Sequence, residues 1–173
     1  GRKPDGPLPP GLDWDTWTGP ALLPPFNENR FHYRWPWHWN YGTGDIGNDG
    51  VHQLDIARWA LSLGAPTRVD GHARKLYFDD DQQTPDTMNL TYSYPDKLIQ
   101  FEMRIWNPYG LEGASNAVAV YGDQGCIHLA SGFKVFDPKG NLVLEEPPSP
   151  DTHAANFIHC VRTRQTPNAD IAE

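Results

Sequence analysis

The chain has 173 residues, enough to bury the core of one domain, and it carries a formal net charge of −8. Neutralisation of phosphates by Lys and Arg supplies most non-specific affinity for nucleic acid, so this acidic balance argues against a nucleic-acid partner. No apolar run approaches the roughly 20 residues that span a bilayer, and we expect a soluble protein without a membrane partner. The compartment, cytoplasmic or exported, stays open.

The first 30 residues are predicted to form an extended arm. Seven prolines fall between Pro4 and Pro25, and proline removes a backbone donor and holds φ near its extended value. The start at Gly1 is typical of a fragment rather than of a natural beginning. We therefore expect residues 31–173 to form the folded domain.

An aromatic segment, residues 31–41, alternates aromatic side chains with polar or basic ones. The pattern predicts a loop or an edge strand that presents aromatic faces. One interpretation is a sugar platform, in which Trp35, Trp37 and Trp39 stack on a pyranose ring and His38 binds its hydroxyls. The other is a flap at a subunit interface or over the core, because aromatic side chains are also enriched where subunits meet.

The next segment has helical spacing. Apolar residues follow a helical period over residues 46–63, and Gly64-Ala65-Pro66 supplies a stop. We expect Asp45 to cap this helix, because its carboxylate can accept the free backbone N–H groups of the first turn. A second helix is expected from a cap at Asp151 or Thr152 to about Arg164.

Between the two helices, alternating apolar and polar residues predict short strands. They are expected at residues 69–78, 88–94, 99–105, 117–121, 126–129, 133–136 and 142–144. Strands joined in succession by short turns form a meander, so the sheet should be open and predominantly antiparallel. The fold class is then α+β, with the helices packed on one face of the sheet. No GxGxxG follows a strand and no P-loop occurs, so we expect no nucleotide cofactor held by this chain.

His52 is the candidate catalytic residue. Asn48 lies four residues before it and Asp49 three, so on a helix either could share its face. A titratable imidazole beside a group that fixes its tautomer can act as a general acid or base. The alternative is a capping turn rich in aspartate, with His52 hydrogen-bonded under the sheet. Five residues are of types that bind metals, but no compact HxxxH-like spacing supports a metal site, and we expect none. These residues are His32, His38, Asp45, Asp49 and His52.

Residues 42–59 resemble the C-terminal, substrate-side domain of the Gfo/Idh/MocA oxidoreductase family, which includes glucose-fructose oxidoreductase and inositol dehydrogenases. The family pattern is a glycine-rich segment followed by Asp-x-Gly-x-His-x-x-Asp. Here it reads Asn48-Asp49-Gly50-Val51-His52-Gln53-Leu54-Asp55. Residues 84–87 and 155–171 resemble the family as well.

The resemblance implies an open sheet whose helix-covered side faces substrate and whose other side forms subunit contacts. Complete members hold NAD or NADP in an N-terminal Rossmann domain, which also contributes a lysine from a Glu-Lys-Pro motif. Neither feature is found in this sequence. The family's histidine maps onto His52, where it would move a proton to or from a sugar hydroxyl. The family's aspartate maps onto Asn48, an amide that can orient a hydroxyl but cannot accept its proton.

We therefore expect a truncated domain of this family that forms a pocket for a sugar or polyol and a homo-oligomer interface through its sheet. It should not be competent alone for NAD(P)-dependent redox chemistry, since a hydride needs an acceptor. Beside the catalytic candidates His52 and Asn48, the candidate substrate-binding residues are Asp45, Asp49, Trp35, Trp37, His38 and Trp39. Two alternatives stay open: an autonomous non-redox carbohydrate-active enzyme or carbohydrate-binding protein, with or without a metal, and a purely structural oligomerisation module.

Overall fold

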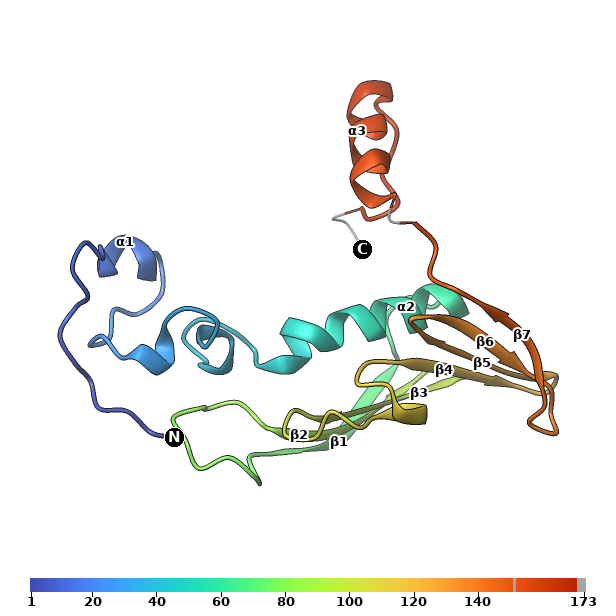
Figure 1. The fold of residues 1–173 in the computed structure, drawn as a ribbon, viewed down its shortest axis with the longest axis horizontal. Helices are drawn as coiled ribbons and strands as arrows, with labels where there is room; N and C mark the ends of the chain where they lie inside the picture. Colours follow the sequence, from blue (N-terminus) through green and yellow to red (C-terminus); the bar gives the residue numbers. More distant parts are fainter. Residues whose placement is uncertain (151, 171–173) are drawn as a thin grey trace. The chain divides into compact units, whose positions relative to one another are not determined.

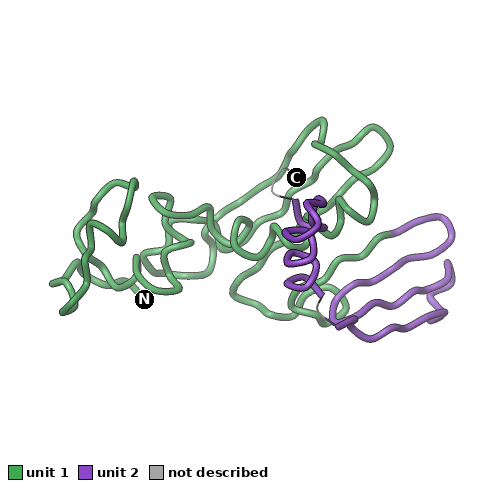
Figure 2. The backbone as a smooth tube through the Cα atoms, turned by 90° about the horizontal axis from the view of Figure 1, so that it is seen from above, with its two compact units in different colours: residues 1–120 green, residues 121–173 purple. Residues whose placement is uncertain are grey.

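A computed structural model describes residues 1–150 and 152–170 of the chain (Figure 1). These residues fall into two compact units, Gly1–Val120 and Tyr121–Glu173, which are coloured separately in Figure 2. Both β-sheets are antiparallel, and helices are few. The α+β class and the open antiparallel architecture expected from the sequence are confirmed, although the strands form two sheets rather than one.

The N-terminal segment builds an aromatic core of its own. Helix α1 (Trp14–Thr18) begins after Asp13, whose carboxylate accepts a hydrogen bond from the backbone N–H of Thr16 at 3.0 Å. The helix places Trp14 and Trp17 in a stack with ring centroids 4.7 Å apart, and Phe26 meets Trp14 edge-on at 5.4 Å. The first 30 residues thus contain a short helix and packed rings between their extended stretches.

Residues 28–61 turn repeatedly before they form a regular helix. Two short 3₁₀ turns, η1 (Glu28–Arg30) and η2 (Trp35–Trp37), precede a π-helical turn, η3 (Ile46–Gly50), which leads into α2 (Val51–Leu61). The aromatic segment is therefore a loop with a helical turn and not an edge strand. The helix predicted from residue 46 exists, but its first five residues are wound more loosely.

The capping role predicted for Asp45 is wrong. Asp45 occupies the N-cap position of η3, but its side chain makes no capping hydrogen bond. The backbone N–H groups of Gly47 and Asn48 instead both bind the carbonyl of Gly44, at 3.2 and 3.1 Å. These first-turn donors are already satisfied, so the carboxylate of Asp45 is left for other contacts.

The first sheet has the order β1-β2-β3, with β1 at Arg68–Arg74, β2 at Thr87–Ser93 and β3 at Leu98–Arg104. Its apolar face buries Met88, Ile99 and Met103, which are 7–8% exposed. The opposite face is polar and open to solvent, as in the exposed cross-strand row His72, Asn89 and Glu102. Apolar and polar residues alternate along these strands, so the apolar side chains lie on one face of the sheet and the polar ones on the other, as expected.

The helical segment approaches the apolar face of this sheet, above which α2 runs in Figure 1. At Gly50 a Cβ atom would lie 2.9 Å from the ring of Phe101, a residue of β3. Glycine at the end of the π-helical turn thus permits close contact between that turn and the sheet.

Strand β1 ends at Arg74, four residues earlier than predicted, because the backbone beyond it binds a carboxylate. The N–H groups of Leu76, Tyr77 and Phe78 donate to Asp86 at 2.9, 2.8 and 2.9 Å. Asp86 is completely buried. Burial alone would raise its pKa, but these backbone donors and the hydroxyl of Thr87 lower the pKa below its ordinary value.

The loop between β1 and β2 also holds the N-terminal segment. The carboxylate of Asp81 accepts from the backbone N–H of Lys3 at 2.7 Å and from the amide of Asn29 at 2.8 Å. The carbonyl of Trp37 accepts from the backbone N–H groups of Gln83 and Thr84, at 2.9 and 3.3 Å. The aromatic loop and the arm are thus tied to the sheet through residues 79–86.

The second sheet has the order β4-β5-β6-β7, and the boundary between the two units falls within β4. Its strands are Val118–Gly122, Gly125–Ala130, Gly132–Phe136 and Leu142–Glu146; the turn η4 (Leu111–Gly113) precedes them, and helix α3 (His153–Thr163) follows. Thr152 is at the N-cap position of α3 without a capping hydrogen bond, and Asp151, the other predicted cap, lies outside the described residues.

No helix among the described residues is long and apolar enough to cross a membrane.

Asp86→Asn is expected to destabilise the first unit by about 3 kcal/mol, because a neutral amide weakens bonds from three buried N–H donors and turns its own NH₂ toward one of them. All seven tryptophans lie in Gly1–Val120, so denaturant unfolding followed by tryptophan fluorescence reports on this unit. The pKa of Asp86 is depressed, so its contribution is present above pH about 4 and is lost as the pH falls further.

The matched control is Asp137→Asn. Asp137 also accepts backbone N–H groups, those of Lys139 and Asn141, but it lies in the turn after β6, in the second unit. This variant should leave the tryptophan transition unchanged. Equal unfolding midpoints for wild type and Asp86→Asn would contradict the role given to the buried carboxylate.

Candidate functional site

The candidate site begins with a glycine-rich turn that bends the chain sharply. Gly44 has φ +77°, a conformation that glycine adopts without strain, and a Cβ there would lie 2.7 Å from the side chain of Thr84. Its backbone N–H donates to the carbonyl of Pro36 at 2.8 Å. Gly44 thus lets the chain pass close to the β1–β2 loop just before the π-helical turn begins.

The π-helical turn places a small cluster of carboxylates and amides together. The amide of Asn48 donates to the carboxylate of Asp45 at 3.4 Å. The amide of Asn116 reaches the carboxylate of Asp49, also at 3.4 Å, from 67 residues further along the chain. π-helical turns occur frequently at functional sites, because the extra residue per turn directs side chains out of the regular helical pattern.

The surroundings of Asp45 disfavour the charged form of its carboxylate. Desolvation by burial raises its pKa above the ordinary value, and the nearby negative charge of Asp49 raises it further. The hydrogen bond from Asn48 acts in the opposite direction but does not cancel these effects. Two aspartates held close together in this way can accept hydrogen bonds from a ligand with several hydroxyl groups, which would relieve part of the desolvation cost.

His52 lies in the first turn of α2, just after the cluster, and its side chain is exposed. Within the part of the chain that the structure describes, no hydrogen bond or ion pair joins its imidazole to Asn48, Asp49 or any other residue. The spacing of four residues puts Asn48 and His52 on one face only of a regular α-helix, and the π-helical turn between them alters that relation. The imidazole is therefore open to a ligand.

The aromatic loop exposes only some of its rings. Trp35 and Trp39 are 42% and 58% exposed, whereas Trp37 is half-buried. The backbone N–H of Trp39 donates to the side chain of Gln83 at 3.0 Å. Among the described residues, no side-chain hydrogen bond or ring contact joins these tryptophans to the π-helical turn, so their role in binding stays a prediction.

His38 lies inside this loop, 3% exposed, rather than on its surface. Its Nε2 lies 2.6 Å from the carbonyl oxygen of Asn29, which can only accept, so Nε2 carries the proton. Burial lowers the pKa of His38, although the bond to Asn29 opposes this effect. The neutral ring therefore links residue 38 to the backbone at residue 29 and helps to hold the loop in its conformation.

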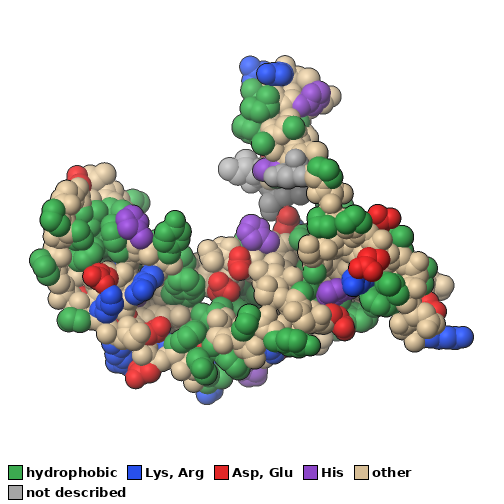
Figure 3. Space-filling view, in the orientation of Figure 1, with side chains coloured by type: hydrophobic (Ala, Val, Ile, Leu, Met, Phe, Trp, Pro, Cys, Tyr) green, Lys and Arg blue, Asp and Glu red, His purple; other side chains and the backbone are tan. Residues whose placement is uncertain are grey.

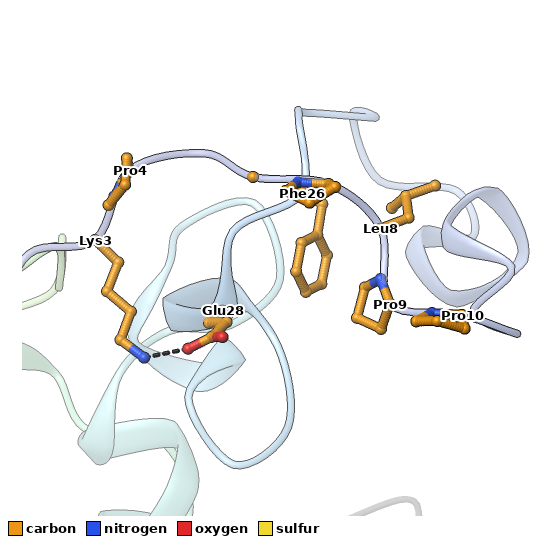
Figure 4. A pocket seen from close by; sticks show the side chains of 9 residues that line it. Lys3, Pro4, Leu8, Pro9, Pro10, Phe26 and Glu28 are labelled. Atoms are coloured by element: carbon orange, nitrogen blue, oxygen red, sulfur yellow. Dashed lines mark hydrogen bonds and ion pairs between the residues drawn. The ribbon is translucent and has the colours of Figure 1, made fainter.

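A cavity of about 490 Å³ lies elsewhere, against the N-terminal segment (Figure 4). It is lined by residues between Lys3 and Glu28, including Leu8, Pro9 and Phe26, and none of the predicted site residues borders it. Lys3 and Glu28 form an ion pair at its edge. Across the described residues, no three His, Cys, Asp or Glu side chains are grouped so that they could hold a metal ion.

Sequence reasoning missed Asn116. It lies in the loop before β4, and its contact with Asp49 spans 67 residues. No local spacing can indicate such a contact, because it depends on how the chain returns after β3. Asp45, Asn48 and Asp49 are candidates from the sequence that the structure brings together in one turn, and their role stays a prediction.

Asp45→Asn is expected to raise the thermal unfolding midpoint at pH 7, because it removes a charge that burial disfavours. Since the pKa of Asp45 is raised in the folded protein, the favourable effect of its neutral form is complete below about pH 4 and is lost as the pH rises through the folded pKa. The variant's advantage should therefore shrink toward pH 4. Tryptophan fluorescence melts from pH 4 to 7 measure it, with exposed Asp55 changed to Asn as the control. A lower unfolding midpoint for Asp45→Asn than for wild type at pH 7 would contradict the conclusion that the charge of Asp45 destabilises the folded protein.

The comparisons with known proteins concern most of the chain. The family model described as "Oxidoreductase family, C-terminal alpha/beta domain" (GFO_IDH_MocA_C2) matches residues 2–170. A crystal structure titled as that of "a putative oxidoreductase from Klebsiella pneumoniae" resembles the chain with a TM-score of 0.56 at 15% identity. The alignment covers 77% of this chain and 43% of that one, so the chain spans less than half the length of that structure. A search of curated proteins finds no match. The chain belongs to the Gfo/Idh/MocA oxidoreductase family and corresponds to its C-terminal α/β domain.

Proposed function

We propose that this domain binds a sugar or polyol at the π-helical turn, with His52 and Asn48 at the reacting hydroxyl and Asp45 and Asp49 at neighbouring hydroxyls. One observation supports the proposal: two carboxylates and two amides, one of them from Asn116, meet at the turn that directly precedes His52 in the chain, and the imidazole of His52 is exposed and has no partner among the described residues. Carboxylates accept hydrogen bonds and amides both donate and accept. This is the combination that adjacent hydroxyl groups require.

Chemistry at this site would divide between His52 and the amide of Asn48. Imidazole is the side-chain group most often used as a general acid or base, so His52 would take or return the proton of the bound hydroxyl. Asn48 would orient that hydroxyl without taking its proton. Oxidation of the hydroxyl also requires a hydride acceptor. We propose that NAD or NADP, where it takes part, is held by another domain or chain, and that this domain binds substrate without transferring hydride alone.

The binding proposal is tested by isothermal titration calorimetry with myo-inositol, D-glucose and D-xylose. At least one should bind, and Asp49→Ala should weaken that binding by tenfold or more, because a hydrogen bond to a charged group contributes roughly 1.5–3 kcal/mol. His52→Ala should weaken it to a smaller extent. The matched control is Asp55→Ala, an exposed carboxylate in α2, the helix that follows the turn.

Absence of binding by all three compounds, or binding unaffected by Asp49→Ala, would contradict the proposal. NADH is titrated in the same way. Tight binding of NADH to this chain alone would contradict the assignment of the nucleotide to another domain or chain.

We also propose that the second sheet mediates homo-oligomer contacts. Register places Ile127, Val135 and Leu144 in one row across three strands, with Leu129 and Phe133 beside it on the same face. None of these five apolar side chains is buried. An apolar sheet face of this kind is typical of homodimer interfaces, which are more apolar than other protein surfaces.

Sedimentation velocity over a range of concentrations tests the oligomer. Wild type should associate, and Val135→Asp, which places a charge in the middle of the apolar row, should shift it to the monomer. Lys134→Asp, on the opposite face of the same strand, is the control and should leave association unchanged. A wild type that stays monomeric at all concentrations would remove this part of the proposal.

A further inference from the structure

A pair of stacked aromatic rings lies at one end of the first sheet. Strands β1 and β3 are both antiparallel to β2, so the segments that follow them leave the sheet at the same end. There the rings of Tyr77 and Trp106 stack with centroids 5.1 Å apart and planes inclined by 18°. Tyr77 is 64% exposed. The pair thus presents aromatic surface to solvent.

The backbone of Tyr77 and the indole of Trp106 are both linked to the buried carboxylate of Asp86. The backbone N–H of Tyr77 donates to it at 2.8 Å. The indole N–H of Trp106 donates to the hydroxyl of Thr87 at 2.9 Å, and that hydroxyl donates to Asp86 at 2.8 Å. A ligand that stacked on this pair would meet rings already held in place and would not have to order them, which reduces the entropic cost of binding.

Two arginines flank Thr87 on the polar face of the sheet. Thr87, which holds Trp106, stands between Arg74 on β1 and Arg104 on β3 in the strand register. The guanidinium of Arg104 is paired with Glu102. That of Arg74 is exposed and forms no hydrogen bond or ion pair with the described residues. Directly opposite side chains in a sheet have Cβ atoms about 5 Å apart, so the side chain of Arg74 starts next to Thr87, the residue to which the indole of Trp106 is hydrogen-bonded.

The size of this surface favours a small ring over a protein partner. An aromatic side chain offers on the order of 150–250 Å², whereas a stable protein interface needs about 800 Å² from each partner. One pyranose ring is matched in size to a single aromatic face. Its C–H groups carry partial positive charge and meet the negative face of the ring.

We propose that Tyr77 and Trp106 form a platform for one pyranose ring, and that Arg74 selects a ring bearing a carboxylate, a uronoside. The platform is separate from the site at His52 and does not depend on the function proposed there. Its ligand is bound by stacking on Tyr77, with the carboxylate paired to the free guanidinium of Arg74.

Saturation-transfer NMR tests the platform with methyl β-D-glucuronide and methyl β-D-glucoside, which differ only in the charged group. The full chain carries His52→Ala and Asp49→Ala in every sample, so that binding at the π-helical turn does not contribute. In this background the glucuronide should bind several-fold more tightly than the glucoside. Arg74→Gln should abolish that difference, and Tyr77→Ala should reduce binding of both compounds by tenfold or more.

Two controls separate ligand contact from damage to the fold. Tyr77→Phe keeps the ring and should keep binding. Tyr121→Ala removes another exposed tyrosine, 73% exposed, from strand β4 and should change nothing. No transfer to either compound, or transfer unaffected by Tyr77→Ala, would overturn the platform. Equal affinity for both compounds with wild-type Arg74 would overturn the selection for a uronoside.

Discussion

The buried carboxylate of Asp86 is the interaction on which the first unit depends. It accepts hydrogen bonds from three consecutive backbone N–H groups and from the hydroxyl of Thr87, and it is completely shielded from solvent. Such charge-assisted bonds are stronger in the low dielectric of a protein interior than in water. They end β1, begin β2 and fix the loop between the two strands.

The candidate site is positioned through that loop. Thr84, also completely buried, lies against Gly44, and the backbone N–H groups at Gln83 and Thr84 hold the carbonyl of Trp37. Gly44 leads directly into the π-helical turn, and Gly50 at its other end contacts Phe101 of β3. The turn that contains Asp45, Asn48 and Asp49 is therefore held by packing contacts at both of its ends. A preorganised turn can keep a desolvated carboxylate such as Asp45 in place where a mobile loop would turn it toward water.

Much of this fold could be predicted from local patterns. The seven strands and two of the helices follow from periods of 2 and 3.6 in apolar residues, which reflect burial on one face. The patterns failed at strand β1 and at helix α1, for different reasons. Strand β1 was extended to Phe78 because the apolar alternation continues, while the backbone there binds Asp86 instead of a neighbouring strand. Helix α1 was missed because prolines surround it, although Asp13 provides a side-chain cap.

The same distinction applies to the site. Asp45, Asn48, Asp49 and His52 could be grouped from spacing alone, and the family resemblance added a role for His52 and Asn48. Asn116 could not be found because it joins Asp49 from 67 residues away, and the burial of His38 depends on its bond to Asn29 within a folded loop. The resemblance identified the family. The contacts of Asn48, which replaces the family's aspartate and donates to Asp45, came from the structure alone.

The central claim is that the π-helical turn binds a sugar or polyol. A crystal structure of this chain soaked with the polyol that binds in solution tests it most directly. We expect density for the ligand within hydrogen-bonding distance of Asp49 and Asn116, with one hydroxyl at the imidazole of His52. Ligand density confined to other parts of the surface, with the side chains of the turn bound only to one another or to water, would contradict the account.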